Sequence, residues 1–196
     1  REALGDALDE ETVQAAVATA SEAGENGLSG MAHLVGSIAL RPPHATKLED
    51  FQSVLQTNLV SAFLALKTAG KAMLKLGQGR MVFTSSVAGS YGLTNHEAIA
   101  AAKGGIEAMV RSAASTYAGR GLRVNAVAPG LTETRLGATV LRSDAIREAS
   151  VGMIPLKRIN EPEEIAQSMH WLLTDAPDNL TGQIIHLDGG MSALRG

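Results

Sequence analysis

The sequence predicts a doubly wound α/β fold of the Rossmann type, in which a parallel sheet carries helices on both faces. Three features support this prediction. Short apolar runs without polar alternation recur along the chain, which is typical of strands buried on both faces. Segments with apolar residues at helical spacing separate these runs, and a turn-forming residue follows each run. Because parallel strands need crossover connections, we expect residues 1–196 to form one such domain.

The first part of the chain predicts a helix, a strand and a second, longer helix. Residues 9–23 open with Asp9 as a helix N-cap candidate, followed by an acidic first turn and apolar residues at helical spacing. Residues 31–35 form a short apolar run that suits a buried strand. Residues 48–76 have the pattern of one long helix.

The remaining elements follow in the same alternation. Residues 80–85 are rich in β-branched and apolar side chains and predict a strand, and a helix is expected over about 98–118. Residues 122–128 predict the next strand, which Pro129 and Gly130 end. A looser stretch runs to Asn160. Pro162 then suits the first position of a helix that ends near residue 174, and residues 183–187 predict the last strand.

Composition excludes several classes of function. A formal net charge of -3 gives no reason to expect a nucleic acid or an anionic membrane surface as a partner. No apolar run is long enough to span a bilayer. The absence of cysteine rules out disulfides, thiolate metal ligands and a cysteine nucleophile, and it fits a cytoplasmic location. We expect no metal site.

Candidate binding residues follow three of the predicted strands. Ligands of open α/β sheets bind beyond the carboxyl ends of the strands. Those positions hold the pairs Gly36-Ser37, Ser85-Ser86 and Pro129-Gly130, whose small or turn-forming residues let a ligand approach the backbone. Taken singly, each pair is more often an ordinary turn than a binding site.

The segment SSVAGSYGLTNHEAIAAAKGG, residues 85–105, makes the prediction more specific. It resembles the active-site stretch of the short-chain dehydrogenase/reductase family, in which a serine ends a strand and Tyr-x-x-x-Lys lies on the next helix. Ser86 and Lys103 match the serine and the lysine of that pattern. The tyrosine position, four residues before Lys103, is occupied by Ile99. This departure puts the proton donor of the family in doubt.

Other motifs resemble the same family in the same order. Residues 33–36, HLVG, match its Asn-Asn-Ala-Gly and retain only Gly36, and Asn58 in TNLVSAF matches its active-site asparagine. RVNAVAPGLTETRL, residues 123–136, matches its Pro-Gly turn, and EPEEIAQSMHWLL and TGQIIHLDGG resemble its closing helix and strand. The resemblance implies a Rossmann-type oxidoreductase that uses NAD or NADP.

The resemblance also implies individual roles. Ser86 would bind the substrate oxygen, Asn58 would distort its helix and hold a water in a proton relay, and Lys103 would stabilise the proton donor and hold the nicotinamide ribose. Thr134 would bind the nicotinamide carboxamide, and Asp6 would sit beside the adenine. The complete set of predicted cofactor-binding residues is Asp6, Gly36, Ser37, Lys103, Pro129, Gly130, Leu131 and Thr134.

The glycine-rich turn with which the family begins has no counterpart before Asp9. We therefore expect the first two strands, their helices and the third strand of the family to lie outside these residues, in a longer protein. Without them the sheet would expose an apolar edge. The residue that distinguishes NAD from NADP would be outside as well.

Several groups could replace the missing phenol. His96 stands three residues before Ile99, one helical turn away if the helix already runs there, and its unperturbed pKa of about 6.5 suits proton exchange near neutrality. Tyr91 in the neighbouring loop is a second candidate, and a water relayed through Asn58 and Lys103 is a third. The alternative is a catalytically silent protein that only binds cofactor or serves as a scaffold. His33 fits a hydrogen-bonded residue at a strand end better than a cofactor contact.

The resemblance finally implies a small-molecule carbonyl or alcohol substrate and a homodimer or homotetramer. The subunits would meet through the helices after residues 48 and 98. Small residues on the second of these helices permit close packing between subunits, although such a helix can equally pack within its own subunit. They are Ala101, Ala102, Gly104 and Gly105.

Overall fold

A computed structural model describes residues 2–194 of the chain and confirms the doubly wound α/β prediction. Four strands form one parallel sheet in the order β1-β2-β3-β4. They are β1 (Gly30–His33), β2 (Gly79–Thr84), β3 (Leu122–Pro129) and β4 (Ile184–Leu187). Each strand lies within two residues of its expected bounds. The two central strands, β2 and β3, are buried on both faces, so their apolar runs mark their positions in the sequence clearly.

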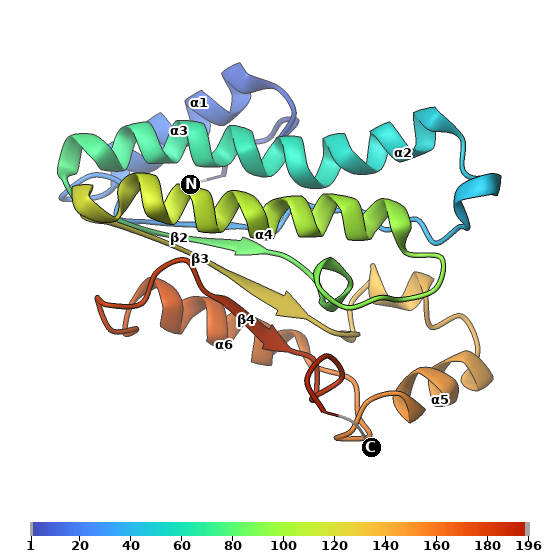
Figure 1. The fold of residues 1–196 in the computed structure, drawn as a ribbon. Helices are drawn as coiled ribbons and strands as arrows, with labels where there is room; N and C mark the ends of the chain where they lie inside the picture. Colours follow the sequence, from blue (N-terminus) through green and yellow to red (C-terminus); the bar gives the residue numbers. More distant parts are fainter. Residues whose placement is uncertain (1, 195–196) are drawn as a thin grey trace.

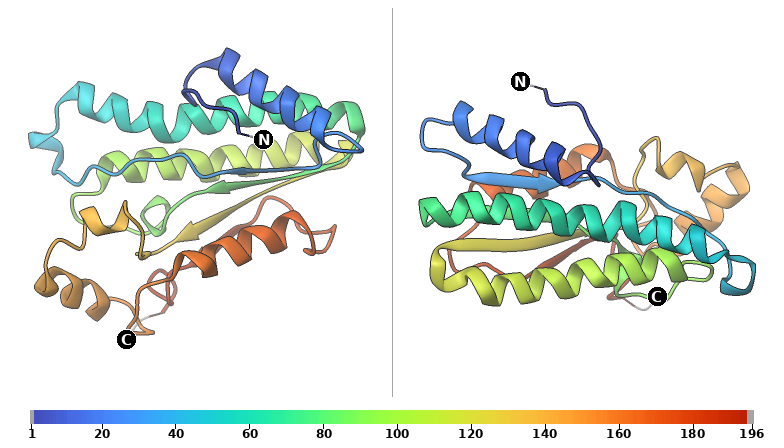
Figure 2. Two further views of the ribbon diagram at one scale, coloured as in Figure 1. Left: turned by 180° about the vertical axis from the view of Figure 1, so that it is seen from behind. Right: turned by 90° about the horizontal axis from the view of Figure 1, so that it is seen from above.

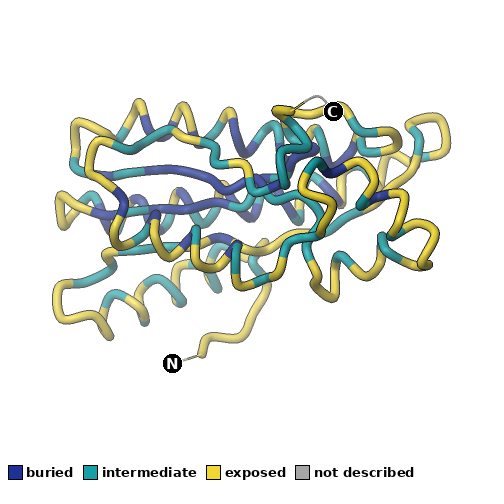
Figure 3. Tube along the Cα trace, turned by 90° about the horizontal axis from the view of Figure 1, so that it is seen from below, coloured by how far each residue is buried: buried dark blue, intermediate teal, exposed yellow. Residues whose placement is uncertain are grey.

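Helices cover both faces of the sheet (Figure 1). On one face lie α1 (Glu10–Ala23), α3 (Ser61–Leu76) and α4 (Glu97–Tyr117), and on the other lies α6 (Pro162–Leu173). Figure 2 shows α3 and α4 side by side along the strands. Buried residues concentrate in the strands and on the helix faces toward them, as Figure 3 shows from below. The larger cluster joins α3 and α4 to β2 and β3.

The predicted long helix over 48–76 is continuous but distorted. It consists of α2 (Leu48–Leu55), a π-helical turn η2 (Gln56–Val60) and α3. The π turn contains Asn58, whose side chain is fully buried and donates to the carbonyl of Val54 at 2.9 Å. A side chain that inserts in this way displaces the regular hydrogen bonds of a helix. The distortion that the resemblance implied at Asn58 is therefore present.

The glycines of α4 serve packing within the chain. A Cβ at Gly105 would lie 2.8 Å from Cδ2 of Leu59, and one at Gly104 would lie 3.1 Å from the carbonyl oxygen of Gly89. Ala102 is completely buried. Of the two explanations for these small residues, the structure supports close packing inside the subunit for these three. A homodimer or homotetramer stays a prediction.

The looser stretch between β3 and α6 contains a helix that the sequence did not predict, α5 (Asp144–Gly152). Ser143 caps it by accepting from the backbone N–H of Ile146.

Within the described residues, the first strand, β1, pairs with β2 on one side and with no strand on the other.

Candidate active site

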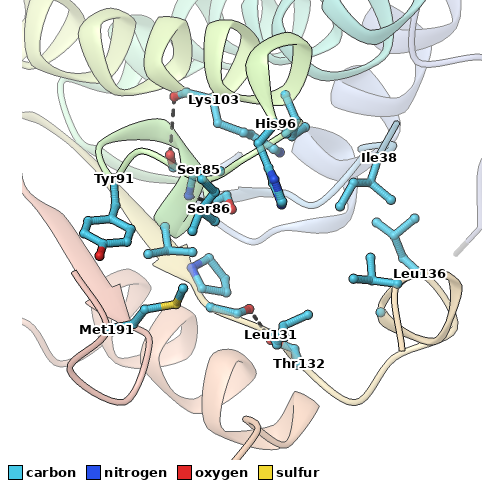
Figure 4. A pocket seen from close by; sticks show the side chains of 18 of the residues that line it. Ile38, Ser85, Ser86, Tyr91, His96, Lys103, Leu131, Thr132, Leu136 and Met191 are labelled. Carbon is cyan, nitrogen blue, oxygen red and sulfur yellow. Dashed lines mark hydrogen bonds between the residues drawn. The ribbon is translucent and has the colours of Figure 1, made fainter. Parts of the chain in front are cut away.

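One large cavity opens at the carboxyl ends of the strands, with a volume of about 1120 Å³ (Figure 4). The loops that follow β1, β2 and β3 all contribute to its wall, as the general rule for open α/β sheets predicts. The predicted residues that it brings together are Gly36, Ser37, Asn58, Ser86, His96, Ile99, Lys103, Pro129, Gly130, Leu131 and Thr134.

Lys103 is the buried cation of this cavity. It projects from α4, and its Nζ donates to the carbonyl oxygen of Thr84 at the end of β2, 2.9 Å away. Only 6% of the residue is exposed, and this burial lowers the pKa of its amine to about 8. An ammonium has three N–H donors, and Thr84 takes one of them. Lys103 is thus charged at neutral pH and keeps donors for a ligand.

Lys103 should give the reaction an alkaline limit. In the role that the resemblance implies for Lys103, the charged ammonium is the active form. We therefore expect kcat/KM for carbonyl reduction to fall as pH rises through about 8, the pKa of the buried amine. A pH profile of cofactor oxidation measures this. In Lys103→Arg the guanidinium stays protonated throughout, so the part of the fall that Lys103 causes near pH 8 should disappear from whatever rate remains, while a fall caused by the proton donor stays. A parent profile that is flat to pH 10 would contradict the assignment.

Gly36 lets Asn58 and Lys103 come close to the end of β1. A Cβ at Gly36 would lie 2.9 Å from Oδ1 of Asn58 and 3.5 Å from Nζ of Lys103. The side chain of Asn58 makes two hydrogen bonds to the backbone of Ser37, the residue after Gly36. Oδ1 accepts from the N–H of Ser37, and Nδ2 donates to its carbonyl oxygen, both at 3.2 Å. The backbone at Ser37 is therefore fixed at the cavity wall, where a cofactor could approach it.

The two serines at the end of β2 have different environments. Ser85 is buried, and its hydroxyl donates to Oε1 of Glu107 at 2.9 Å, which makes it structural. Ser86 lines the cavity, and its Oγ accepts from the N–H of Ala88 at 3.2 Å. A hydroxyl that accepts one bond still has its own proton to donate. Ser86 is therefore both a cap for the following turn and a possible donor to a substrate oxygen.

Ile99 faces the cavity from an apolar cluster. It is 3% exposed and packs with Val54, Ala88 and Ala102. An isoleucine can neither donate nor accept a proton. The expected tyrosine position thus contributes an apolar surface instead of a phenol.

His96 also lines the cavity, and Figure 4 shows its ring directed into it. The residue is not one helical turn before Ile99, because α4 begins at Glu97 and His96 occupies its N-cap position. This corrects the assumption that the helix already ran there. Nδ1 lies 2.7 Å from the carbonyl oxygen of Thr94, which can only accept, so Nδ1 carries the proton. That bond leaves Nε2 as the basic nitrogen of the neutral ring.

The loop after β3 supplies the opposite wall. Thr134 and Leu131 both line the cavity there. Oγ1 of Thr134 accepts from the N–H of Gly137 at 2.9 Å, and its hydroxyl donates to the carbonyl of Thr132 over a long 3.5 Å. A Cβ at Gly130 would lie 3.0 Å from Cα of Asp188, which shows that this glycine is also needed for packing against the segment after β4.

Two candidates lie away from this cavity. Asp6 and His33 line a separate hollow between the N-terminal segment, α1, β1 and α3. Nε2 of His33 is 3.0 Å from Oγ of Ser61, while its buried Nδ1 has no partner among the described residues. Burial and the charge of Lys103 lower the pKa of His33 to about 4. His33 is thus a neutral strand-end residue, bonded through one nitrogen only, and the role of Asp6 beside an adenine stays a prediction.

The sequence reasoning missed most of the apolar wall. Leu93, Leu136, Val140, Met153 and Met191 all line the cavity. They come from loops and, in the case of Met153, from the residue that follows α5, where no periodic pattern marks the side that faces inward. No group of three or more His, Cys, Asp or Glu residues that could hold a metal occurs within residues 2–194, and no helix there is long and apolar enough to cross a membrane.

Comparisons with known proteins identify relatives of this chain. A family model described as enoyl-(acyl carrier protein) reductase matches residues 3–192. The chain is 34% identical over 193 residues to a Xanthobacter autotrophicus protein named inactive 2-(S)-hydroxypropyl-CoM dehydrogenase 2, covering 96% of this chain and 84% of that protein. It is 40% identical over 146 residues to the 3-oxoacyl-[acyl-carrier-protein] reductase of Synechocystis, covering 74% of this chain and 57% of the relative.

A solved structure shows the same arrangement. The protein from Beutenbergia cavernae described as an NAD(P)-dependent gluconate 5-dehydrogenase, with NADP bound at low occupancy, superposes with a TM-score of 0.88 at 32% identity. The match covers 97% of this chain and 76% of that structure. Fold and site together define a Rossmann-type oxidoreductase. The chain belongs to the short-chain dehydrogenase/reductase family.

Proposed function

We propose that this protein transfers hydride between NAD or NADP and a carbonyl or alcohol substrate, with a group other than tyrosine as the proton donor. The observation that carries the proposal is the cavity in which Ser86, Lys103 and Asn58 meet at the strand ends. The residues present fit a nicotinamide cofactor: Gly36 and Ser37 offer accessible backbone, Lys103 has free donors, and the hydroxyl of Thr134 is engaged only over a long 3.5 Å to the carbonyl of Thr132. When bound, the cofactor supplies or accepts the hydride.

The protein groups divide the remaining tasks. Ser86 donates to the substrate oxygen, and the ammonium of Lys103 stabilises the negative charge that develops there. Once Nε2 has taken a proton from solvent, the imidazolium of His96 donates that proton to the oxygen and returns to the neutral ring, with Nδ1–H anchored to the carbonyl of Thr94. Tyr91 lines the same cavity, but it is 42% exposed on its loop, whereas the ring of His96 is fixed in the cavity by the bond of Nδ1 to the carbonyl of Thr94.

His96→Ala tests the donor. A general acid contributes about 10²–10⁴ in rate, so we expect kcat/KM for carbonyl reduction to fall by roughly 10²-fold or more. Cofactor oxidation by the intact protein over a panel of ketones and aldehydes provides the measurement. His44→Ala, which removes an exposed histidine outside the cavity, is the matched control and should change nothing. Full activity in His96→Ala would show that the proton comes from elsewhere.

The second candidate function is a catalytically silent cofactor-binding or scaffold protein. Ile99 favours it, and so does the relative whose name describes it as inactive. The two functions differ in one observable, since a silent protein binds NADPH without oxidising it with any carbonyl. A homodimer or homotetramer located in the cytoplasm belongs to the proposal in either case.

A further inference from the structure

We infer that the substrate is an uncharged, predominantly apolar ketone or aldehyde, of the alicyclic or medium-chain type. The inference rests on the proposed function and adds the chemical class of the substrate. It is carried by the composition of the cavity wall, by the exposure of its apolar side chains, and by the way in which nearby charges are already paired.

The wall around the reacting end of the cavity is apolar on both sides. Leu93 and Ile99 lie on the α4 side. Leu136, Val140 and Met153 face it from the segment between β3 and the end of α5. Figure 4 shows Leu136 on one side of the cavity and Met191, from the segment after β4, on the other. Where the family pattern has a phenol, Ile99 adds hydrocarbon to this wall.

Several of these side chains are unusually exposed. Leu136 is 47% exposed, Met153 57% and Leu194 61%, and all three line the cavity. Exposed large apolar side chains that gather at one cavity mark a binding surface. An apolar ligand would remove this area from water, which is favourable in proportion to the area covered.

The cavity wall holds few charged side chains, and the proposed reaction already uses one of them, Lys103. No Asp, Glu or Arg lines it within the described chain, and its lysines are Lys103 and Lys157. Nζ of Lys103 is held by Thr84, and Nζ of Lys157 donates to the carbonyl of Gly152 at 2.8 Å.

Neighbouring arginines are engaged outside the wall. Arg147 makes two bonds to the carboxylate of Glu133, at 2.6 and 2.7 Å, and Arg158 makes two such bonds to Glu164. None of these four residues lines the cavity. A keto acid would therefore find no bidentate partner for its carboxylate there.

Steady-state cofactor oxidation by the intact protein tests the inference with methyl ketones from 2-butanone to 2-octanone. We expect kcat/KM to rise about three- to fourfold for each added methylene until the cavity is filled. 4-tert-Butylcyclohexanone should exceed 5-ketogluconate and acetoacetate by at least roughly 100-fold. Equal or better turnover of either keto acid would overturn the inference while leaving the proposed function intact.

Variants connect the effect to the wall. Met153→Glu places a carboxylate at the mouth and should lower kcat/KM for 2-octanone at least tenfold while affecting 2-butanone less. Leu48→Ser is the matched control, because Leu48 is 65% exposed on α2 and does not line the cavity. An identical loss for long and short ketones would contradict the apolar wall as the binding surface.

If the protein reduces none of these carbonyls, the proposed function is wrong. A measurement of ligand binding then tests the substrate class without reference to turnover. Calorimetric titration of the NADPH-loaded protein with 4-tert-butylcyclohexanone should show binding that Met153→Glu weakens. Binding of 5-ketogluconate in its place would overturn the inference.

Discussion

Lys103→Met should reduce kcat/KM for carbonyl reduction by roughly 10³-fold. Methionine has a similar length but no charge, so the developing alkoxide loses its stabilising cation and the cofactor loses a donor. The protein should still fold, because removing a charge that is 6% exposed removes a desolvation cost along with the single bond to Thr84.

Initial rates and the melting temperature together measure this effect. Lys71→Met is the matched control, since Lys71 is an exposed lysine on α3. It should keep both the rate and the melting temperature of the parent. A Lys103→Met protein with an unchanged rate would show that the buried ammonium takes no part in the reaction.

Ser86→Ala should lower kcat/KM by about 10²–10³-fold, the usual cost of losing one donor to a developing oxyanion. Its neighbour provides the contrast. Ser85→Ala deprives the buried carboxylate of Glu107 of its bond and should cost about 1–3 kcal/mol of stability. Denaturant titration and initial rates of both variants separate the two roles. Interchanged effects, with Ser85→Ala losing rate and Ser86→Ala losing stability, would show that the roles are reversed.

The sheet could be predicted from the sequence because its central strands are buried on both faces. β2 and β3 are uninterrupted apolar runs bounded by turn residues, and such runs have few alternative positions. The polar ends of these strands then indicated the site, since the carboxyl ends of parallel strands meet at one edge. Ser86 was found this way, whereas Asn58 and Lys103 lie on helices and were found through the family resemblance, which also supplied the roles of all three.

The segment from Leu131 to Asn160 could not be predicted in the same way. Its backbone is fixed by long-range contacts, such as the bridge between Thr132 and Asn160 and the bond from Asn160 to the carbonyl of Leu187. Local periodicity does not record such contacts. For the same reason α5 and the inward side chains Leu136 and Met153 became visible only in the structure.

The position of His96 shows a smaller limit. Sequence spacing placed it one helical turn from Ile99, but the helix starts one residue later, and the ring enters the cavity from the cap instead. Helix ends are uncertain by one or two residues in any such reading. The candidate survived because the cap position also faces the cavity.

The central claim is that the site works without the phenol, and the turnover of the parent beside Ile99→Tyr tests it most directly. The measurement is NADPH oxidation with 4-tert-butylcyclohexanone by both proteins. We predict that the parent protein oxidises the cofactor with this ketone. The rate of Ile99→Tyr should be little higher or lower than that of the parent, because the tyrosine ring must enter the apolar cluster around Val54 and Ala88. A parent without turnover, together with activity gained in Ile99→Tyr, would contradict the claim and show a silenced site.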